Sequence, residues 1–339
     1  MRLDAHSTMP AARCPKPVER VARPALAPPA AAGFGDRFLR LPDMFPARQS
    51  GECWGEERIV VRFAGSDYVC EGLSATQAAA VRERFGALCP APATDGGPAV
   101  TLRVFRAFAD EFVTDDREWE FDFDLDYAPG VVRFAGFHFL GRLDGTAQLR
   151  AALWTPEDSR LVSHAIFENV LRVVAAYHLL GQGGVLLHSA AVADDAGAHV
   201  FFGPSGAGKS TISRLAMAAH RAVLSDDMNA LRGTAGGVTV EKVPFAGDIG
   251  QTQETADGRF PVRCLCRLEK GETPALRAMR PASAVAALLE CAPFVNRNPY
   301  RYDELVATLQ ALNARLPVRA LTFAPDHRVW ELLRTEGAR

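Results

Sequence analysis

The stretch Gly203–Thr211, GPSGAGKST, limits what this chain can fold into more than any other part of its sequence. It matches the pattern G-x-x-x-x-G-K-[S/T] of phosphate-binding (Walker A) loops at Gly203, Gly208, Lys209 and Ser210. The β-branched and aromatic run AHVFF precedes the motif, and the amphipathic segment STISRLAMAAH follows it. We therefore predict a strand, a P-loop and a helix in that order, which is a unit of α/β domains.

The residue types of the motif explain how it would bind a phosphate. Glycines let the backbone approach phosphate oxygens with its N–H groups pointing inward, and the following helix directs the positive end of its dipole at the anion. Lys209 can reach the β- and γ-phosphates, while the hydroxyl of Ser210 can bind Mg²⁺. We expect nucleotide contacts from Gly203, Pro204, Ser205, Gly206, Ala207, Gly208, Lys209, Ser210 and Thr211.

Two adjacent carboxylates follow the next predicted strand, in the sequence RAVLSDD. Asp226 and Asp227 come at its carboxyl end, where ligands bind in α/β sheets. One carboxylate could hold Mg²⁺ while the other takes a proton from an acceptor hydroxyl. A turn or helix cap formed by the two aspartates is the structural alternative.

His188 lies in the segment upstream of the motif, VLLHSAAVA, which a short DDAG turn joins to AHVFF. The short connection predicts two antiparallel neighbouring strands, which would bring His188 toward the floor of the nucleotide site. A structural role and a functional role for this histidine are both open at this point.

These elements together resemble the HPr serine kinase/phosphorylase family, whose P-loop fold is shared with phosphoenolpyruvate carboxykinases. The matching segments are LLHSAAV, GPSGAGKST and VLSDD, in that order, and the resemblance is clearest over residues 183–230. Downstream, VPFAGDIGQTQETADGRF replaces the glycine-rich stretch of true HPr kinases, so the similarity is to the broader group of HPr-kinase-like proteins. Some of those accompany peptide-modifying gene clusters.

The resemblance implies a role for each matching side chain. Asp226 would be the general base that activates an acceptor hydroxyl, and His188 would orient or polarise that hydroxyl. Asp227 would hold Mg²⁺ together with Ser210, and ATP would be the phosphoryl donor. Glu241 and Asp248 are the two choices for a later acidic metal ligand. Homo-oligomers are common among kinases of this kind.

The rest of the chain divides into three predicted parts. Residues 1–35 are rich in proline and alanine and are predicted to be a disordered leader. Residues 36–156 read as strands with one helix over 74–87, opened by a capping box with Ser74 as N-cap and Gln77 three residues later, which predicts an α+β module. Residues 157–335 begin with a helix and continue as the α/β nucleotide-binding domain.

Composition excludes some classes of protein. The formal net charge of −2 gives no basic field for nucleic acid, and no apolar run is long enough to span a membrane. The seven scattered cysteines suit reduced thiols, and no signal-peptide core is visible, so we expect a cytoplasmic location. Cys264 and Cys266 would share one face of a strand, where a metal or redox site is less expected than two buried apolar side chains.

The leading hypothesis is an ATP-dependent kinase that transfers the γ-phosphoryl group to a hydroxyl of a peptide, protein or small molecule. The alternative is a nucleotide-binding ATPase or regulatory protein in which water is the acceptor. A carboxykinase is favoured by fold alone, and the chain lacks a recognisable extra metal-binding lysine and histidine.

Overall fold

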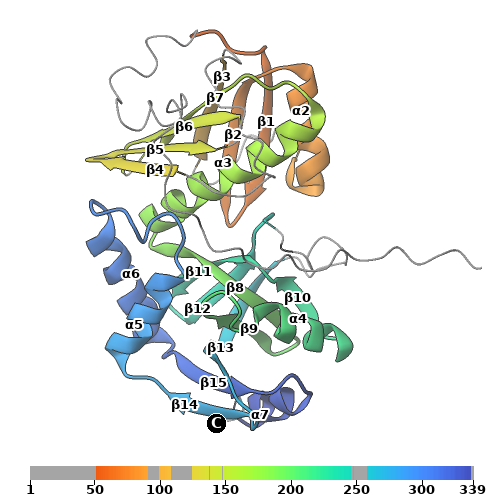
Figure 1. Ribbon diagram of the computed structural model, residues 1–339, viewed down its shortest axis with the longest axis vertical. Coiled ribbons are helices and arrows are strands. Elements are labelled where there is room, and N and C mark those ends of the chain that lie inside the picture. The colour runs from red at the N-terminus through yellow and green to blue at the C-terminus, as the bar shows by residue number, and fades with distance from the viewer. Residues whose placement is uncertain are drawn as a thin grey trace, which may run out of the picture. The chain divides into compact units, whose positions relative to one another are not determined.

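The structure, a computed structural model, describes residues 51–90, 99–107, 124–136, 138–146, 148–245, 247 and 258–336. The described residues belong to one compact unit and form two β-sheets and six α-helices (Figure 1). The predicted mixed α/β class is therefore confirmed. The predicted leader lies outside the described residues, and the module boundary at residue 156 remains a prediction.

The first sheet has the order β1-β2-β3-β7-β6-β5-β4. Strands β2, β3 and β7 run parallel, and the other neighbours are antiparallel. Buried and less buried residues alternate along β3 and β5, as expected for strands with one face against a core. The strands are β1 (Glu57–Phe63), β2 (Ser66–Leu73), β3 (Ala99–Arg106), β4 (Asp124–Ala128), β5 (Val131–Gly136), β6 (Phe139–Asp144) and β7 (Arg150–Thr155).

Two helices pack together beside this sheet, α2 (Ala75–Phe85) and α3 (Arg160–Gly181). Helix α2 begins with the predicted capping box: Ser74 Oγ accepts from the N–H of Gln77, and Gln77 Oε1 accepts from the N–H of Ser74. A short 3₁₀ turn, Gly86–Leu88, continues it. Helix α3 is buried along most of its length and also packs against β8 of the second sheet.

The second sheet carries the phosphate-loop sequence. Its parallel strands are β9, β13 and β15, and β8 runs antiparallel to β9, as predicted from the short turn between them. The long strand β8 also pairs with β10 and β11, while β12 joins β11 to β13 and β14 pairs with β15. The strands are β8 (Gly184–Asp194), β9 (Gly197–Phe202), β10 (Ala222–Ser225), β11 (Met228–Thr234), β12 (Gly237–Lys242), β13 (Arg259–Lys270), β14 (Ala275–Ala278) and β15 (Arg319–Phe323).

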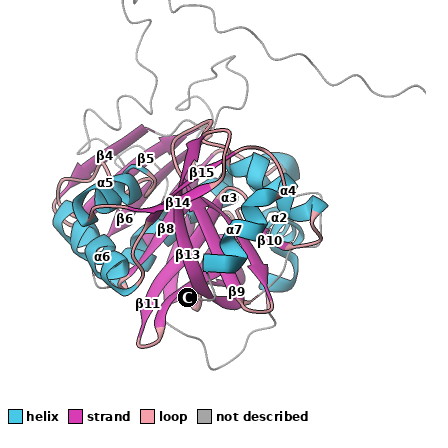
Figure 2. Cartoon of the chain, turned by 90° about the horizontal axis from the view of Figure 1, so that it is seen from below, coloured by secondary structure: helices cyan, strands magenta, loops and turns pink. Residues whose placement is uncertain are grey.

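Helices cover both faces of this sheet (Figure 2). One face packs against α4 (Lys209–Ala218) and α7 (Arg328–Glu336), and the other against α5 (Pro281–Glu290) and α6 (Tyr302–Arg315). Strand β13 shows the division: Cys264 and Cys266 belong to the cluster with α4 and α7, whereas Leu265 belongs to the cluster with α5 and α6. The period-two alternation of a strand explains why adjacent residues enter different clusters.

Candidate functional site

The motif GPSGAGKST lies between β9 and α4, so the strand and helix predicted around it are both present. Gly206 and Gly208 have positive φ values of 75° and 111°, which residues with a Cβ rarely adopt. A Cβ on Gly208 would also come within 2.9 Å of the ring of Phe323. The loop turns back on itself through the N–H of Ala207, which donates to the carbonyl of Pro204 at 3.1 Å.

The amino end of α4 is open to an anion. Gly208 is its N-cap residue, and no side chain caps the helix, so its first N–H groups are left for an outside acceptor. Pro204, Ser205 and Gly206 are exposed just ahead of the helix. This arrangement fits a phosphate group, because both the helix dipole and the N–H groups favour negative charge there.

Lys209 is buried at the start of α4, and Ser210 and Thr211 are half-buried beside it. The ammonium group of Lys209 donates to the carbonyl of Gly203 at 3.0 Å and lies 3.4 Å from that of Pro204. Burial lowers the pKa of Lys209. The charge is thus held at the loop in partly desolvated surroundings, where it interacts more strongly with an anion than it would in water.

The two aspartates occupy the tight turn that joins β10 to β11. Ser225 organises this turn, since its hydroxyl accepts from the N–H groups of Asp227 at 3.2 Å and Met228 at 3.3 Å. The N–H of Ser189 donates to the carbonyl of Asp227, and Met228 pairs with His188 in the β8–β11 ladder. Strand pairing therefore brings His188 and the aspartates to the same end of the sheet.

The side chains of His188 and Asp227 lie next to each other. Nδ1 of His188 lies 3.4 Å from Oδ1 of Asp227. Partial burial, followed by the positive charges of Lys209 and Arg172, lowers the pKa of His188 to about 4. Burial is also the main cause that raises the pKa of Asp227 above its usual value. At neutral pH His188 is therefore a neutral imidazole that can accept or donate a hydrogen bond.

Asp226 is buried close to the backbone of Gly247. Its exposed fraction is 5%, and a Cβ on Gly247 would come within 2.7 Å of Asp226 Oδ1. Such close approach holds the carboxylate between the β10–β11 turn and the chain at Gly247. The sequence did not single out this glycine.

An ion-pair network of buried and partly buried side chains, formed by Arg84, Glu168, Arg172 and Asp227, contacts the aspartate turn from α2 and α3. Arg172 lies 2.8 Å from Glu168 and 3.3 Å from Asp227, and Arg84 donates to Glu168 at 2.8 Å. Sequence reasoning missed this network. The available signal was a charged pair four residues apart, Glu168 and Arg172, within an otherwise apolar helix.

Cys291, which follows α5, also contacts the site, and the sequence did not assign it there. Its carbonyl accepts from the N–H of His188 at 2.8 Å, and the N–H of Gly203 donates to its sulfur. Burial raises the pKa of this thiol. Cys291 thus connects the strand of His188 to the first residue of the loop.

Of the two candidates for a later metal ligand, the structure describes only Glu241. Glu241 forms an ion pair with Arg259 at 3.0 Å and accepts from the N–H of Gly65. Asp248 lies outside the described residues. Among the residues that the structure describes, no group of three or more His, Cys, Asp or Glu side chains could hold a metal by itself.

None of the helices in the described part of the chain is long and apolar enough to span a membrane.

Acid is expected to weaken the fold partly through His188. Its folded pKa of about 4 lies below the ordinary 6.5, so between these values the unfolded chain binds more protons and stability falls as the pH falls. The raised pKa of Asp227 acts in the opposite direction, because its folded form binds a proton more readily than the unfolded form. A comparison with His188→Gln isolates the histidine.

Urea denaturation at several pH values between 6.5 and 4 measures this effect. We expect the free energy of unfolding to fall less steeply with acid in His188→Gln than in the wild type. Equal slopes in the two proteins would show that the imidazole remains free to take a proton in the folded chain.

A scan against protein-family models and a search of the curated proteins find no match to this chain. The motif and the geometry of the residues around it are therefore what indicates a function for this chain.

Proposed function

We propose that this chain is a cytoplasmic ATP-dependent kinase with an HPr kinase/phosphoenolpyruvate carboxykinase-like nucleotide-binding domain. The domain would span residues 157–335 and transfer the γ-phosphoryl group of ATP to a hydroxyl of a peptide, protein or small molecule. The observation that carries the proposal is that Cys291 contacts both His188 and Gly203, the first residue of the phosphate-loop sequence, while His188 lies 3.4 Å from Asp227. The anion-binding groups and the acid–base groups are thus close enough to serve one reaction.

The residues at the loop fit a bound nucleotide. The uncapped amino end of α4 and the exposed loop residues Pro204–Gly206 would hold the phosphates, and Lys209 would turn from its carbonyl partners to the γ-phosphate. Ser210 and Asp227 would hold Mg²⁺, which neutralises charge on the transferred group. A cation beside Asp227 would favour its ionised form and so oppose the effect of burial.

Asp226 would be the general base. It is buried beside Gly247, and it would take the proton of the acceptor hydroxyl as that oxygen approaches the phosphorus. His188, neutral and held near Asp227, would orient the hydroxyl by a hydrogen bond. Asp227 and Asp226 would then have separate roles although they are adjacent in sequence.

Transfer of label from γ-labelled ATP tests the proposal. The protein would be incubated with Mg²⁺ and with peptides and proteins of the extract of its own cells, and Asp226→Asn would be compared with the wild type. We expect label on an acceptor and a loss of about 100-fold or more in Asp226→Asn, because general-base catalysis contributes roughly 10²–10⁴-fold. Asp195→Asn, a change in the exposed turn between β8 and β9, is the matched control and should leave transfer unchanged.

ATP binding separates loss of chemistry from loss of the site. Asp226→Asn should bind ATP as the wild type does, since Asp226 is assigned no contact with the nucleotide. Free phosphate released without any acceptor, at equal rates in the wild type and Asp226→Asn, would contradict the kinase and favour the nucleotide-driven ATPase or regulator instead.

A further inference from the structure

A pair of cysteines stands on the face of β13 that packs against α4 and α7. Cys264 and Cys266 are two residues apart on the strand, and their sulfur atoms lie 3.1 Å from each other. Both belong to the same apolar cluster, as expected for buried side chains at this spacing. Neither residue takes part in the proposed kinase chemistry.

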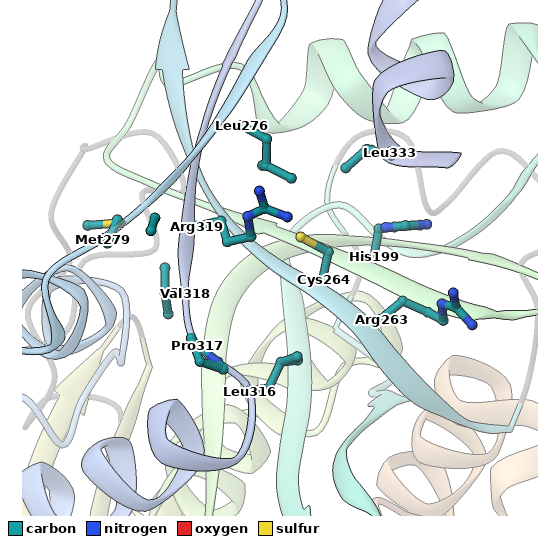
Figure 3. Close-up of a pocket in the computed structure, with 11 residues that line it drawn as sticks. His199, Arg263, Cys264, Leu276, Met279, Leu316, Pro317, Val318, Arg319 and Leu333 are labelled. Carbon is teal, nitrogen blue, oxygen red and sulfur yellow. The ribbon is translucent and has the colours of Figure 1, made fainter. Parts of the chain in front are cut away.

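The two thiols differ in their access to a cavity of about 390 Å³. Cys264 lines this cavity together with His199, Arg319, Leu276 and Leu333 (Figure 3), whereas Cys266 does not line it and is fully buried. Figure 3 shows the sulfur of Cys264 on the side of Arg319. A small reagent that enters the cavity would therefore meet Cys264 first, with Cys266 directly behind it.

The surroundings of Cys264 favour its thiolate. The hydrogen bond from the Cys266 thiol is the largest cause, and a hydrogen bond from His199 and the charge of Arg319 add to it, so that the pKa of Cys264 falls to about 6. The pKa of Cys266 is raised, chiefly by the same hydrogen bond and by burial. One sulfur is thus a nucleophile at neutral pH, and the other holds a proton.

We propose that Cys264 and Cys266 form a redox-active dithiol that a small peroxide, entering the cavity at Cys264, converts to a disulfide within β13. The sulfur of Cys264 attacks one oxygen of hydrogen peroxide, so that an S–O bond forms, the O–O bond breaks and hydroxide leaves. The sulfur of Cys266 then attacks that of Cys264, forming the S–S bond and releasing the second hydroxide. The two thiol protons and the two hydroxides give two waters, and the peroxide is reduced by two electrons.

The distance between the sulfurs favours a disulfide over a metal site. Two thiolates on one tetrahedral zinc ion, with Zn–S bonds of about 2.3 Å, are separated by roughly 3.8 Å. The observed 3.1 Å is shorter, and in the described part of the chain no third donor completes a metal cluster. The pair is therefore arranged for bond formation between the sulfurs.

Strand geometry predicts that this disulfide is easily reversed. Residues two apart in a strand have Cα atoms roughly 6.6 Å apart, near the upper end of the range of about 4.4–6.8 Å that disulfides span. A bond at that limit is strained and is reduced more easily than a structural disulfide. Reversible oxidation, rather than permanent cross-linking, is the expected behaviour.

Mass spectrometry of the full chain tests the proposal without reference to kinase activity. After treatment with hydrogen peroxide, free thiols are blocked with N-ethylmaleimide and the protein is digested with trypsin, which releases the peptide CLCR after Arg263 and Arg267. We expect this peptide to lack both maleimide groups and two hydrogen atoms, and to regain two reactive thiols after reduction with dithiothreitol. Peptides with the single buried thiols Cys70 and Cys291 serve as controls and should remain reduced.

The variant Cys266→Ala identifies the attacking sulfur. Without its partner, Cys264 should stop at the sulfenic acid and be trapped by dimedone, and His199→Leu should slow that trapping several-fold because a donor to the thiolate is lost. Cys264→Ala should leave Cys266 unmodified. A CLCR peptide that stays fully reduced while Cys53 or Cys89 is oxidised would overturn the proposal. Sulfinic acid at Cys264 of the wild type, with no disulfide, would overturn it equally.

Discussion

Replacement of Lys209 by alanine is expected to reduce phosphoryl transfer by at least about 100-fold and to weaken ATP binding, with little change in stability. The lysine is the one cation that the motif supplies to the β- and γ-phosphates, and loss of a single preorganised donor at a developing charge costs roughly 10²–10³ in rate. Its ammonium group contacts the carbonyls of Gly203 and Pro204, so the substitution also removes these two contacts within the loop.

The stability argument follows from the burial of Lys209. Burial lowers the pKa of Lys209 because the charged ammonium is less well solvated in the folded chain than in water. Removing the charge therefore removes this desolvation penalty. The lost hydrogen bonds of the ammonium group oppose this relief. Because the two effects have opposite signs, the net change in the free energy of unfolding should be small.

Calorimetric titration with ATP and the labelled-transfer assay measure the two effects, and urea denaturation checks the fold. Lys270→Ala is the matched control, since Lys270 is exposed at the carboxyl end of β13. Wild-type transfer by Lys209→Ala would show that GPSGAGKST does not bind the transferred phosphate. A large loss of stability would instead show that the lysine holds the loop together.

The sequence predicted those parts of the fold and of the site that depend on residues close together in the chain. The loop lies between the predicted strand and helix, β8 and β9 pair as their short turn required, and the capping box at Ser74 and Gln77 begins α2. Each depends on residues close together in sequence. Turn, cap and motif patterns in the local sequence are therefore enough to predict these features without knowledge of the tertiary packing.

The parts that could not be predicted depend on distant residues. Arg84 and Glu168 are 84 positions apart, and the chain at Gly247 reaches Asp226 only through the fold. An arginine in an apolar helix reads as an interruption of the pattern, and no local rule identifies which carboxylate it will meet. The partners of Arg172 became visible only once α3 was packed against the β10–β11 turn.

Replacement of Arg172 by alanine is expected to destabilise the fold by about 3–5 kcal/mol, the cost of removing one partner from a buried ion pair. Arg172 is 7% exposed and contacts both Glu168 and Asp227. Its loss therefore leaves the buried Glu168 and the partly buried Asp227 with Arg84 as the observed cation partner of Glu168. Its guanidinium also lies 5.7 Å from the ring centre of Phe245, so the substitution removes packing as well as charge.

Urea denaturation at neutral pH measures this loss, with Arg142→Ala as the control. Arg142 pairs with Asp144 on β6, but the two side chains are 35% and 41% exposed. Because water screens such a pair, this substitution should cost less than about 1 kcal/mol. The double variant Arg172→Met with Glu168→Gln should recover part of the stability, since methionine restores apolar volume and glutamine removes one of the two carboxylate charges that Arg172 compensates. If the double variant were as unstable as Arg172→Ala, neither the lost apolar volume nor the charge of Glu168 would account for the loss, and the contact of Arg172 with Asp227 would be what α3 contributes.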